Sequence, residues 1–504
     1  MPVHLSGRQR CERRCDSKAN AEKSREYDLI VIGAGPGGAT LASLAANEGK
    51  KVLVVDKNPA AGGRMMTVHR DGHSYEMFPL NLVPHAPSLF EELQERVGKT
   101  VRNVTVGVED AVNPIYIAPD GKVTLIDVKS LSVLKSLGLR NPVTLIRTAL
   151  WFRRVMTMKE EEILKLGGVS AYDYMQRQKF PDILKVFITA AMGEGAFEMS
   201  SDLVPASSMI RMIQLAMDPK RTQQRYYEGG IGGFFSRMLE RVPENGGDLL
   251  YSTRVSKVIV ENGRAAGVVT AAGDEYRAPV VASSAGIRQT VSFLVGEEHF
   301  PTEYAERVSN LRSNLCDVGY RYFTTRKILP CSTYVLFPYD CLEPWSAFEE
   351  MAAGRRKPKG NYIYLGTKSI FPTIGPEDGR QVIYAVMSCV PDMNQDFSPY
   401  LEYIERRVAT VFPELYEEGA IERKEVMSLQ ACAALGVDPV SEGRGGESYG
   451  IAACIGQADA QTPKTETPVP GLYIVGNDAE GFGLGTHRAV DSGFKVFEKI
   501  RDRL

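Results

Sequence analysis

The stretch Tyr27–Arg64, YDLIVIGAGPGGATLASLAANEGKKVLVVDKNPAAGGR, decides the fold of this chain. Residues 29–32 form an apolar run of strand length, and the glycine-rich turn GAGPGG at residues 33–38 follows directly. Helix formers dominate residues 39–47, and residues 51–55 form a second apolar run. Strand, glycine turn, helix and strand in this order predict a dinucleotide-binding unit of the Rossmann type.

The glycine turn and the end of the second strand carry the nucleotide-binding prediction. Gly33 permits the tight turn, Gly35 lets the backbone approach a pyrophosphate, and Gly38 lets helix and strand pack closely. Phosphate oxygens then sit on the N-terminus of the helix. Asp56 ends the second strand, where a carboxylate accepts hydrogen bonds from an adenosine ribose and disfavours the 2′-phosphate of NADP. The predicted nucleotide-binding residues are Gly33, Gly35, Pro36, Gly37, Gly38, Asp56 and Lys57.

A second glycine signature, Gly62-Gly63-Arg64, follows Asp56 shortly afterwards. With both signatures in place, the chain resembles the flavoprotein family that includes amine oxidases and phytoene desaturases, and most of all its phytoene desaturase and carotenoid isomerase branch. The resemblance implies an α/β fold in which a Rossmann-type FAD-binding domain is interwoven with an α+β substrate domain. It also implies FAD as the cofactor, held in part by Gly62, Gly63 and Arg64. The alternative is that the two glycines only form a loop turn.

Two later segments extend the resemblance. After the turn EGGIGGF, a strand and hairpin place Val255 where the backbone of family members meets the adenine of FAD. Near the C-terminus, Gly476 and Asp478 follow a short buried strand, and an acid in this place hydrogen-bonds the ribityl chain in the family. Thr486 and His487 match the start of a helix whose N-terminus points at the flavin pyrimidine. The dipole of that helix would stabilise negative charge on reduced flavin.

The resemblance offers two catalytic candidates, His487 and Glu76. The His487 side chain suits a proton donor or acceptor beside the flavin, because imidazole titrates near neutrality; the alternative is that only its backbone N–H matters. Glu76 lies in a predicted hairpin around Asp71-Gly72, near the position of a family acid. It approaches the flavin side together with His73, or it is an exposed hairpin residue. One departure weakens a desaturase assignment: residues 480–485 read EGFGLG, where many desaturases carry a His-Pro-Gly-Gly loop.

The chain is too long for one simple core. Its 504 residues, of which 43% are hydrophobic, indicate two interwoven domains. The N-terminal stretch is polar and Arg-rich without the apolar region of a secretory signal, so we predict a disordered tail. We predict the tail at residues 1–26, the FAD-binding domain at 27–88, 226–299 and 438–504, and the substrate domain at 89–225 and 300–437.

Composition argues against several classes of function. A net charge of −2 gives no basis for general nucleic-acid binding, so we predict no nucleic-acid partner. The eight cysteines and six histidines are scattered, without CxxC or HExxH spacing, so we predict no metal site and the reduced thiols of a cytoplasmic protein. Nothing outside the nucleotide turn approaches an uncharged membrane span, which favours a soluble or peripheral protein.

A basic segment marks the first part of the predicted substrate domain, where residues 89–226 read as mostly helical. Residues 128–159 contain seven Lys or Arg and no acid. In a helix from Pro142 onwards, Arg147 and Arg154 share a face. Such a basic amphipathic helix suits peripheral contact with an anionic membrane; a solvated helix face is the alternative. The apolar side chains of this helix are Leu145, Leu150, Phe152 and Met156.

Two further groups are candidates to line a substrate cavity. The Met-rich residues 207–217 form part of a tunnel for a long hydrocarbon, or they are ordinary core. Predicted strands at residues 318–324, 362–366 and 382–387 carry several tyrosines, which wall the cavity or pack between strands. These tyrosines are Tyr320, Tyr322, Tyr362, Tyr364 and Tyr384.

These observations predict an FAD-dependent oxidoreductase. It transfers a hydride between flavin N5 and a bulky apolar substrate, such as an isoprenoid, polyene or other lipid-like molecule, and forms or reduces a C=C bond. No second GxGxxG follows a strand, so we expect no NAD(P)H domain, and electrons leave to oxygen, a quinone or the product. The alternatives are a flavin amine oxidase, a redox-neutral FAD-dependent isomerase or hydratase, and a non-catalytic FAD-binding protein.

Overall fold

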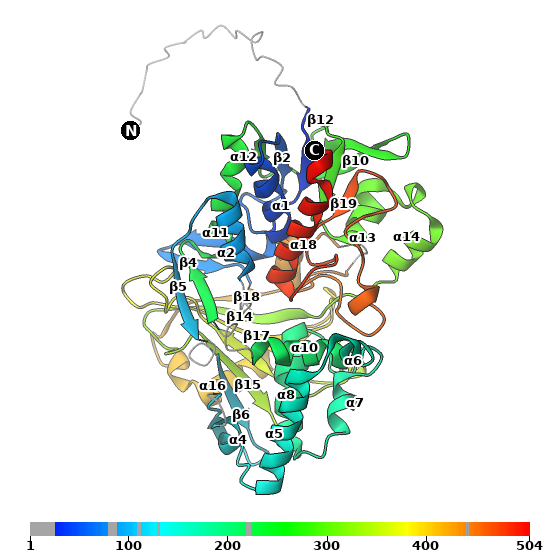
Figure 1. The fold of residues 1–504 in the computed structure, drawn as a ribbon. Coiled ribbons are helices and arrows are strands. Elements are labelled where there is room, and N and C mark those ends of the chain that lie inside the picture. The colour runs from blue at the N-terminus through cyan, green and yellow to red at the C-terminus, as the bar shows by residue number, and fades with distance from the viewer. Residues whose placement is uncertain are drawn as a thin grey trace, which may run out of the picture.

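The computed structural model describes residues 26–78, 88–107, 112–128, 132–217, 223–439, 441 and 443–504. Two domains lie end to end, and the chain passes between them several times (Figure 1). The first strand and the C-terminal helix lie in one domain, and the helices of residues 132–217 lie in the other. The tail predicted at residues 1–26 falls outside the described residues apart from Glu26, which forms an isolated β-bridge with Arg277.

The nucleotide-binding domain is built on a five-stranded parallel sheet in the order β19-β13-β1-β2-β9. The sequences of β1 and β2, LIVI and VLVV, are buried at every position, as expected of a parallel sheet that is covered on both faces. The predicted strands on either side of the glycine turn are therefore confirmed. The five strands are β1 (Leu29–Ile32), β2 (Val52–Val55), β9 (Asp248–Leu250), β13 (Val280–Ser283) and β19 (Leu472–Ile474).

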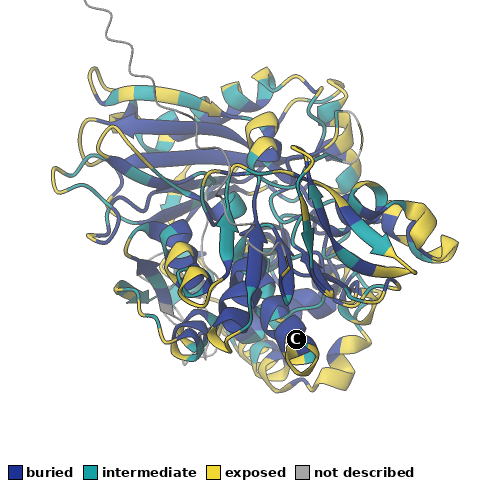
Figure 2. Ribbon diagram, turned by 90° about the horizontal axis from the view of Figure 1, so that it is seen from above, coloured by how far each residue is buried: buried dark blue, intermediate teal, exposed yellow. Residues whose placement is uncertain are grey.

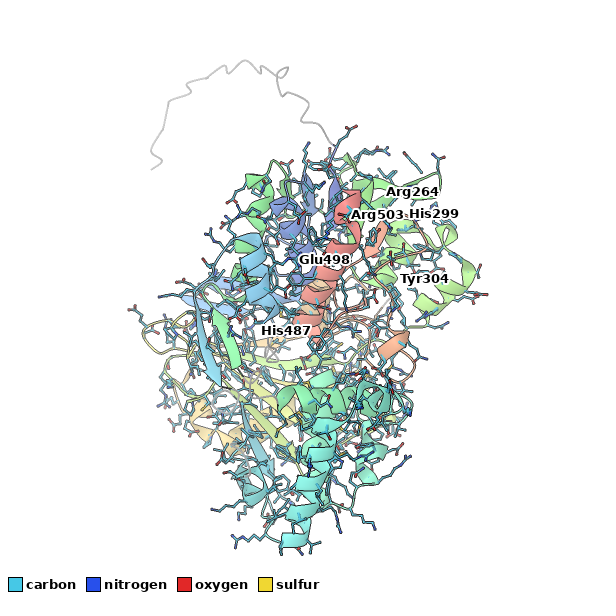
Figure 3. The ribbon with its side chains drawn as sticks, viewed as in Figure 1. Arg264, His299, Tyr304, His487, Glu498 and Arg503 are labelled. Atoms are coloured by element: carbon cyan, nitrogen blue, oxygen red, sulfur yellow. The ribbon has the colours of Figure 1, made fainter. Side chains whose placement is uncertain are left out.

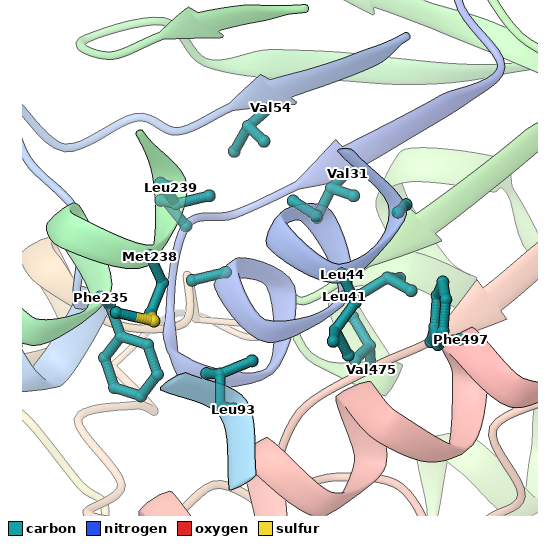
Figure 4. Packing of buried hydrophobic residues seen from close by; sticks show 14 of the residues in the cluster. Val31, Leu41, Leu44, Val54, Leu93, Phe235, Met238, Leu239, Val475 and Phe497 are labelled. Atoms are coloured by element: carbon teal, nitrogen blue, oxygen red, sulfur yellow. The ribbon is translucent and has the colours of Figure 1, made fainter. Parts of the chain in front are cut away.

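Helices cover one face of this sheet and form its main core. Figure 4 shows Val31 and Val54 of the sheet, Leu41 and Leu44 of α1, and Phe497 of α18 in this core. The small side chains of α1, PGGATLASLAAN, let the helix lie close to its neighbours. The helices are α1 (Pro36–Asn47), α2 (Leu89–Val97), α11 (Gly230–Leu239), α12 (Arg241–Glu244) and α18 (Gly485–Ile500).

The opposite face of the parallel sheet packs against a second layer. Ile30 and Ile32 share a core with Val258 and Val268 of a three-stranded antiparallel sheet. The predicted hairpin turn is confirmed at Asn262-Gly263, where both residues have positive φ. The strands are β10 (Val255–Glu261), β11 (Arg264–Thr270) and β12 (Glu275–Arg277), with the π-helix η3 (Thr290–Val295) and helix α14 (Thr302–Ser309) beside them.

Two predicted domain boundaries are wrong. Residues from 89 onwards were assigned to the substrate domain, yet Phe90 and Leu93 of α2 are buried in the nucleotide-binding core. Residues from 300 onwards were assigned in the same way, yet Ala305 and Val308 of α14 pack in the second layer of that domain. Each helix follows a predicted domain boundary, at residue 89 or 300, but its apolar face is buried in the nucleotide-binding domain.

The substrate domain is built on a seven-stranded sheet in the order β18-β14-β17-β16-β15-β6-β7. Its neighbouring strands pair antiparallel, except that β6 and β15 run parallel. The three strands predicted in residues 318–387 are confirmed as β14, β16 and β17. The seven strands are β6 (Val112–Ile117), β7 (Val123–Leu125), β14 (Cys316–Thr324), β15 (Thr333–Pro338), β16 (Ile363–Gly366), β17 (Val382–Cys389) and β18 (Ile421–Met427).

The prediction of mostly helical structure in residues 89–226 is wrong in part. Strands β6 and β7 extend the large sheet, and β5 (Asn103–Gly107) pairs with β8 (Gln223–Tyr227). The β6 sequence, VNPIYI, contains Pro114 and has no clear alternation. Its strand conformation comes from pairing with β15, far along the chain, which local sequence patterns do not report.

Helices cover both faces of the large sheet. On one face, Tyr334 and Leu336 share a core with helices α15 and α16; on the other, Val335 and Phe337 meet the helices of residues 132–217. Figure 2 shows buried strands and exposed residues on the outer helices and loops. The helices are α4 (Ser132–Ser136), α5 (Pro142–Thr157), α6 (Glu160–Leu164), α7 (Ala171–Gln176), α8 (Asp182–Thr189), the π-helix η2 (Ala190–Glu194), α9 (Gly195–Phe197), α10 (Ala206–Ala216), α15 (Trp345–Ala352) and α16 (Ser398–Val411).

No helix in the described part of the chain has the length and apolar character needed to cross a membrane. The described residues also contain no group of three or more His, Cys, Asp or Glu side chains arranged to hold a metal ion.

Candidate functional site

A cavity of about 680 Å³ lies between the two domains and is lined by both. All the residues predicted to hold FAD line it, apart from Gly38 and His487. Segments far apart in the sequence therefore meet at one place, as the resemblance implied. The predicted residues in the cavity wall are Gly33, Gly35, Pro36, Gly37, Asp56, Lys57, Gly62, Gly63, Arg64, Val255, Gly476, Asp478 and Thr486.

The two glycine signatures form one side of the cavity. Gly33 and Gly62 have φ values of +95° and +110°, which side chains other than glycine rarely adopt. The Gly62 amide donates a hydrogen bond to the Ala34 carbonyl oxygen at 2.9 Å, so the second signature packs on the nucleotide turn. Gly38 lies behind the wall, where a β-carbon would stand 2.1 Å from the Gly33 oxygen. This confirms its predicted role in close helix packing.

Asp56 is buried below the nucleotide turn, and its carboxylate is already hydrogen-bonded. Oδ2 accepts from the Ala34 amide at 2.6 Å, and Oδ1 accepts from the Asn58 amide at 2.7 Å. Burial raises the pKa of Asp56, against the lowering effect of these amides. The neighbouring Lys57 Nζ lies 2.6 Å from Asp438 Oδ1. The carboxylate thus fixes the turn, and its contact with an adenosine ribose stays a prediction.

Asp478 joins two other segments at the cavity wall. Its Oδ2 accepts a hydrogen bond from the Ile287 amide, and its Oδ1 accepts one from the Ile451 amide, both at 3.0 Å. Helix α18 begins at Gly485, and this residue and Thr486 line the cavity. The N-terminus of α18, the positive end of its dipole, therefore lies at the cavity, where it can stabilise an anion. The ribityl contact of Asp478 stays a prediction.

Arg64 holds a loop of the chain instead of projecting freely into the cavity. Its guanidinium donates to the carbonyl oxygen of Glu447 at 2.7 Å and to that of Tyr449 at 3.0 Å. The Asn477 side-chain amide donates to the same Tyr449 oxygen at 3.0 Å. We call residues 447–449 the clamped loop, because the side chains of Arg64 and Asn477 fix its backbone.

The structure does not support a proton-transfer role for the His487 side chain. Its ring is buried and packs edge-on against Phe90 of α2, with the ring centroids 5.2 Å apart. Figure 3 labels His487 near the start of α18. Its side chain is therefore on the core side of this helix, whereas Gly485 and Thr486 line the cavity. The alternative, in which only the His487 backbone N–H matters, stays a prediction; this N–H donates to the Leu484 carbonyl oxygen at 3.1 Å.

Glu76 also lies away from the cavity wall. The predicted hairpin is confirmed as β3 (Thr67–Arg70) and β4 (His73–Glu76) around the Asp71-Gly72 turn. Glu76 Oε1 accepts a hydrogen bond from the Ile231 amide at 3.3 Å, at the start of α11, and Glu76 is buried. His73 is buried too, and burial lowers its pKa. The carboxylate of Glu76 supports the N-terminus of α11, and the structure gives it no place beside the cavity.

The half of the cavity formed by the substrate domain is mainly apolar. Met212 of the predicted Met-rich stretch lines it, whereas Met209 is core and Met217 is exposed. Of the five candidate tyrosines, Tyr362 and Tyr364 line the cavity. The other three, Tyr320, Tyr322 and Tyr384, are buried elsewhere. The apolar lining residues include Phe187, Ala190, Ala191, Met192, Met212, Val335 and Phe337.

Two half-buried carboxyl groups, absent from the sequence-based predictions, also line this half. Glu198 Oε2 accepts a hydrogen bond from the Ser388 hydroxyl at 3.0 Å, and Asp317 Oδ2 accepts one from the Ser448 hydroxyl at 3.2 Å. Burial raises the pKa of Asp317 to about 7. Burial, followed by the charge of Asp317, raises the pKa of Glu198 well above its usual range. Asp317 carried a signal in the sequence, because it is an acid inside the largely apolar strand CDVGYRYFT.

The comparison with protein families agrees with this geometry. Residues 39–498 match the sequence model of the family of flavin-containing amine oxidoreductases. The chain belongs to this family. Its cofactor is FAD, and the two glycine signatures, Asp56 and the N-terminus of α18 fit an extended anionic dinucleotide along the cavity.

Relatives of this amine oxidoreductase family member include carotenoid enzymes. A chloroplastic prolycopene isomerase of Daucus carota is 28% identical over 321 residues, which cover 57% of this chain and 51% of that protein. A phytoene desaturase of Fusarium fujikuroi is 23% identical over 395 residues, covering 71% of this chain and 65% of that protein. The chain spans about half the length of the first curated relatives it matches.

Solved structures confirm the fold. A putrescine oxidase with bound putrescine has a TM-score of 0.69 at 15% identity, covering 95% of this chain and 99% of that one. An oxidoreductase from Methanosarcina mazei has a TM-score of 0.68 at 18% identity, covering 94% of this chain and 100% of that one. The predicted fold, a Rossmann-type FAD-binding domain interwoven with an α+β substrate domain, is therefore confirmed.

Proposed function

We propose that this flavoprotein transfers a hydride between the flavin and a carbon of a bulky apolar substrate, forming or reducing a C=C bond. The supporting observation is the apolar half of the cavity, where Phe187, Met192, Met212 and Phe337 form part of the wall. When bound, FAD supplies the hydride acceptor or donor. The residues of the chain hold the substrate between the domains and exclude water from it.

The few ionisable groups on this wall also favour a neutral substrate. Among the described residues of the substrate domain that line the cavity, Glu198 and Asp317 are the two with carboxyl groups, and none is Lys or Arg. Burial favours the neutral form of both carboxyls. The similarity to a prolycopene isomerase and to phytoene desaturases supports a long isoprenoid or polyene as the substrate class.

Extraction of the purified protein with organic solvent, followed by mass spectrometry, tests the proposal first. We expect FAD together with a co-purifying unsaturated lipid. Under anaerobic conditions, an isoprenoid that the enzyme oxidises should bleach the absorption band of oxidised flavin. A polyene that the enzyme reduces should restore this band when it is added to the reduced protein. If no apolar compound changes the flavin spectrum, the proposal is wrong. The same assay with oxygen and quinones identifies the electron acceptor.

A redox-neutral double-bond isomerase is the second candidate, and the similarity to prolycopene isomerases supports it. Such an enzyme keeps its flavin reduced over many turnovers, so it needs only catalytic amounts of reductant. Product formation far in excess of added reductant would distinguish it from a desaturase or reductase. An amine oxidase shares the fold, as the putrescine oxidase likeness shows, and rapid peroxide release with amines would identify one.

We also propose that α5 contacts an anionic membrane surface. Val143, Ile146 and Leu150 are about 60% exposed, at 59%, 62% and 61%, on a helix that has no acidic residue. Arg147 and Arg153 of the same helix are exposed beside them. Figure 1 shows α5 at the end of the substrate domain farthest from the nucleotide-binding domain.

Two details of the predicted membrane surface need correction. Leu145 and Phe152 are half-buried and pack against the substrate-domain core. The predicted Leu150 and Met156 are exposed, and Val143 and Ile146 complete the exposed apolar face. Lys129, part of the basic segment, lies outside the described residues. Exposed aliphatic and basic side chains together fit a lipid surface that carries negative charge. Sedimentation with phosphatidylserine vesicles, compared with phosphatidylcholine vesicles, tests this contact.

A further inference from the structure

We propose that Glu198 and Asp317 form a proton-sharing carboxyl pair that exchanges one proton with the substrate carbon next to the carbon that gives up or receives the hydride. This inference rests on the proposed function, because it assigns the proton that must accompany the hydride. Cavity lining, neighbouring strand positions and an unusual backbone conformation carry it independently.

The large sheet places the two carboxyls side by side. Asp317 on β14 stands directly opposite Ser388 on β17 in the antiparallel register. Residues opposite each other in such a pair project from the same face, about 4.5–5.5 Å apart at their β-carbons. The Ser388 hydroxyl donates to Glu198 Oε2 at 3.0 Å, and the Tyr362 hydroxyl lies 3.1 Å from the Ser388 oxygen. The carboxyl of Glu198 is therefore bonded to the side chain that stands opposite Asp317.

The clamped loop holds the pair close to the flavin-binding motifs. Ser448, the central residue of this loop, donates to Asp317 Oδ2, while Arg64 fixes the carbonyl groups on either side of it. The ring of Tyr449 lies beside the start of α18, since a β-carbon on Gly485 would stand 3.1 Å from Tyr449 Cε1. Asp317 is thus linked through Ser448 to the second glycine signature and to the helix that faces the cavity.

The backbone of Glu198 is held in an uncommon conformation. Glu198 ends α9 with φ +46° and ψ +50°, a left-handed conformation that costs free energy for any residue other than glycine. The Asn314 side-chain amide and the Leu315 amide both donate to its carbonyl oxygen, at 2.7 and 3.0 Å. The π-helix η2, a rare element that often marks functional sites, precedes it along the same cavity wall. The fold thus maintains a strained residue to place this carboxyl.

No basic group offsets the charge of the pair. Within the described residues, neither Glu198 nor Asp317 forms an ion pair with Lys, Arg or His; their bonding partners are hydroxyl groups. Two carboxylates without a counter-ion cannot both ionise readily when they lie together in an apolar cavity, and the neighbouring Glu194 carboxyl raises the pKa of Glu198 further. The pair therefore keeps one proton at neutral pH, and it titrates as a unit instead of as two separate residues.

This proton completes the balance of the reaction. When a C=C bond forms, one carbon loses a hydride to the oxidised flavin. The adjacent C–H bond breaks, its proton passes to the ionised carboxylate of the pair, and its electron pair becomes the π bond. In the reverse direction the protonated carboxyl donates to one carbon of the double bond while the reduced flavin supplies hydride to the other. A hydroxyl-bonded acid in an apolar cavity suits either step.

Infrared spectroscopy of the FAD-loaded protein tests whether the pair exists. Carbon-13 labelling of Asp and Glu identifies the C=O stretch of protonated carboxyls across a pH series. We expect an acid band that persists to about neutral pH, and either Asp317→Asn or Glu198→Gln should remove or shift it. Glu343→Gln is the matched control, because Glu343 is a buried carboxyl outside the cavity that pairs with Arg356. Glu194, a buried carboxyl whose pKa burial also raises, contributes an acid band of its own, so the pair is identified by the band that both cavity variants lose while their FAD content stays unchanged.

Deuterium transfer tests the role of the pair in the reaction. Reduction of a polyene in D2O should place deuterium on the carbon next to the one that receives the hydride, in addition to the deuterium that reaches the hydride-accepting carbon from the exchangeable N5 position of reduced flavin. Each cavity variant should slow turnover by about 10²–10⁴-fold with its FAD content unchanged. An absent acid band, or wild-type turnover in both variants, overturns the pair while the proposed function stands. Turnover of amines alone overturns the proposed function and, with it, proton transfer to carbon.

Discussion

Gly37 of α1 lies so close to Gly476 that a β-carbon at position 37 would stand 2.8 Å from the Gly476 amide nitrogen. The same β-carbon would stand 2.9 Å from the Ala489 carbonyl oxygen of α18. These neighbours are backbone atoms that cannot rotate aside. The helix that begins at the nucleotide turn, the loop after β19 and the C-terminal helix therefore meet with room for glycine alone.

Replacing Gly37 with alanine should weaken FAD binding and destabilise the protein. Overpacking of this kind costs about 1–3 kcal/mol, because backbone segments must move apart. The bound FAD after gel filtration and the thermal unfolding midpoint measure the two effects. Gly168→Ala serves as the control, since a β-carbon there would meet nothing within 4 Å. Equal FAD retention in both variants would contradict the close approach.

Replacing Arg64 with methionine should release the clamped loop. The variant loses hydrogen bonds to the Glu447 and Tyr449 carbonyls, and bonds from a charged donor contribute about 1.5–3 kcal/mol each. We expect a lower unfolding midpoint and faster proteolysis of residues 447–449 in limited digestion. Arg102→Met, at a side chain that is 70% exposed, should change neither measurement. A clamped loop that stays resistant in the Arg64 variant would refute this role.

Asp317 should make the stability of the protein depend on pH. Its pKa is raised from 3.8 to about 7 by burial, so the folded state binds this proton more tightly than the unfolded state. The stabilising contribution is fully present below pH 3.8 and is lost as pH rises through about 7. The unfolding free energy of Asp317→Asn minus that of the wild type should therefore increase with pH over this range. Urea titrations at several pH values measure it, and a constant difference would show that the pKa is not raised.

Replacing His487 with asparagine should leave the chemistry largely intact. The ring packs on Phe90 in the core, so the variant is expected to unfold at a lower temperature. Its turnover should fall far less than the roughly 10²–10⁴-fold expected when a catalytic acid or base is removed. Stopped-flow reduction of the flavin, compared with that of Asp317→Asn, separates the two residues. A loss of turnover as large as that of Asp317→Asn would show that the imidazole takes part in the reaction.

Replacing Ile146 and Leu150 with serine should reduce binding to phosphatidylserine vesicles. Each substitution removes an exposed aliphatic side chain from α5 without touching the core. Replacing Val426 with serine is the control, because this residue is 52% exposed on β18, away from α5. The remaining binding should weaken further as salt rises, since the arginines of α5 contribute through charge. Unchanged sedimentation of the double variant would contradict the proposed surface.

The nucleotide-binding half of the fold was predictable because its physical demands are local in sequence. The nucleotide turn and the second signature need glycine, at Gly33 and Gly62, because φ is positive there. The end of the second strand needs a hydrogen-bond acceptor, which Asp56 supplies. Val255 and Asp478 could be placed because each follows a strand and a turn that the sequence also marks. The parallel sheet follows from these units, since its strands are continuous apolar runs.

The substrate-domain half of the cavity was not predictable in the same way. Glu198 owes its position to a left-handed backbone and to bonds from Asn314 and Leu315, more than a hundred residues away. His487 was predicted from the chemistry of imidazole. The direction of its side chain depends on which face of α18 packs against α2, and the local sequence does not report this packing. Helix α2 itself was assigned to the wrong domain for the same reason. Local patterns report an element, whereas contacts between distant elements decide which of its faces is functional.

The strand order of the nucleotide-binding sheet has a consequence for how the protein is made. Strand β13 lies between β1 and β19, and α18 packs on α1, so the first segment of the domain needs partners from the last. During synthesis, the N-terminal glycine turn emerges from the ribosome long before Gly476 and α18 exist to enclose a cofactor. A chain truncated before residue 472 would therefore lack β19, Gly476 and α18, and with them part of the cavity wall.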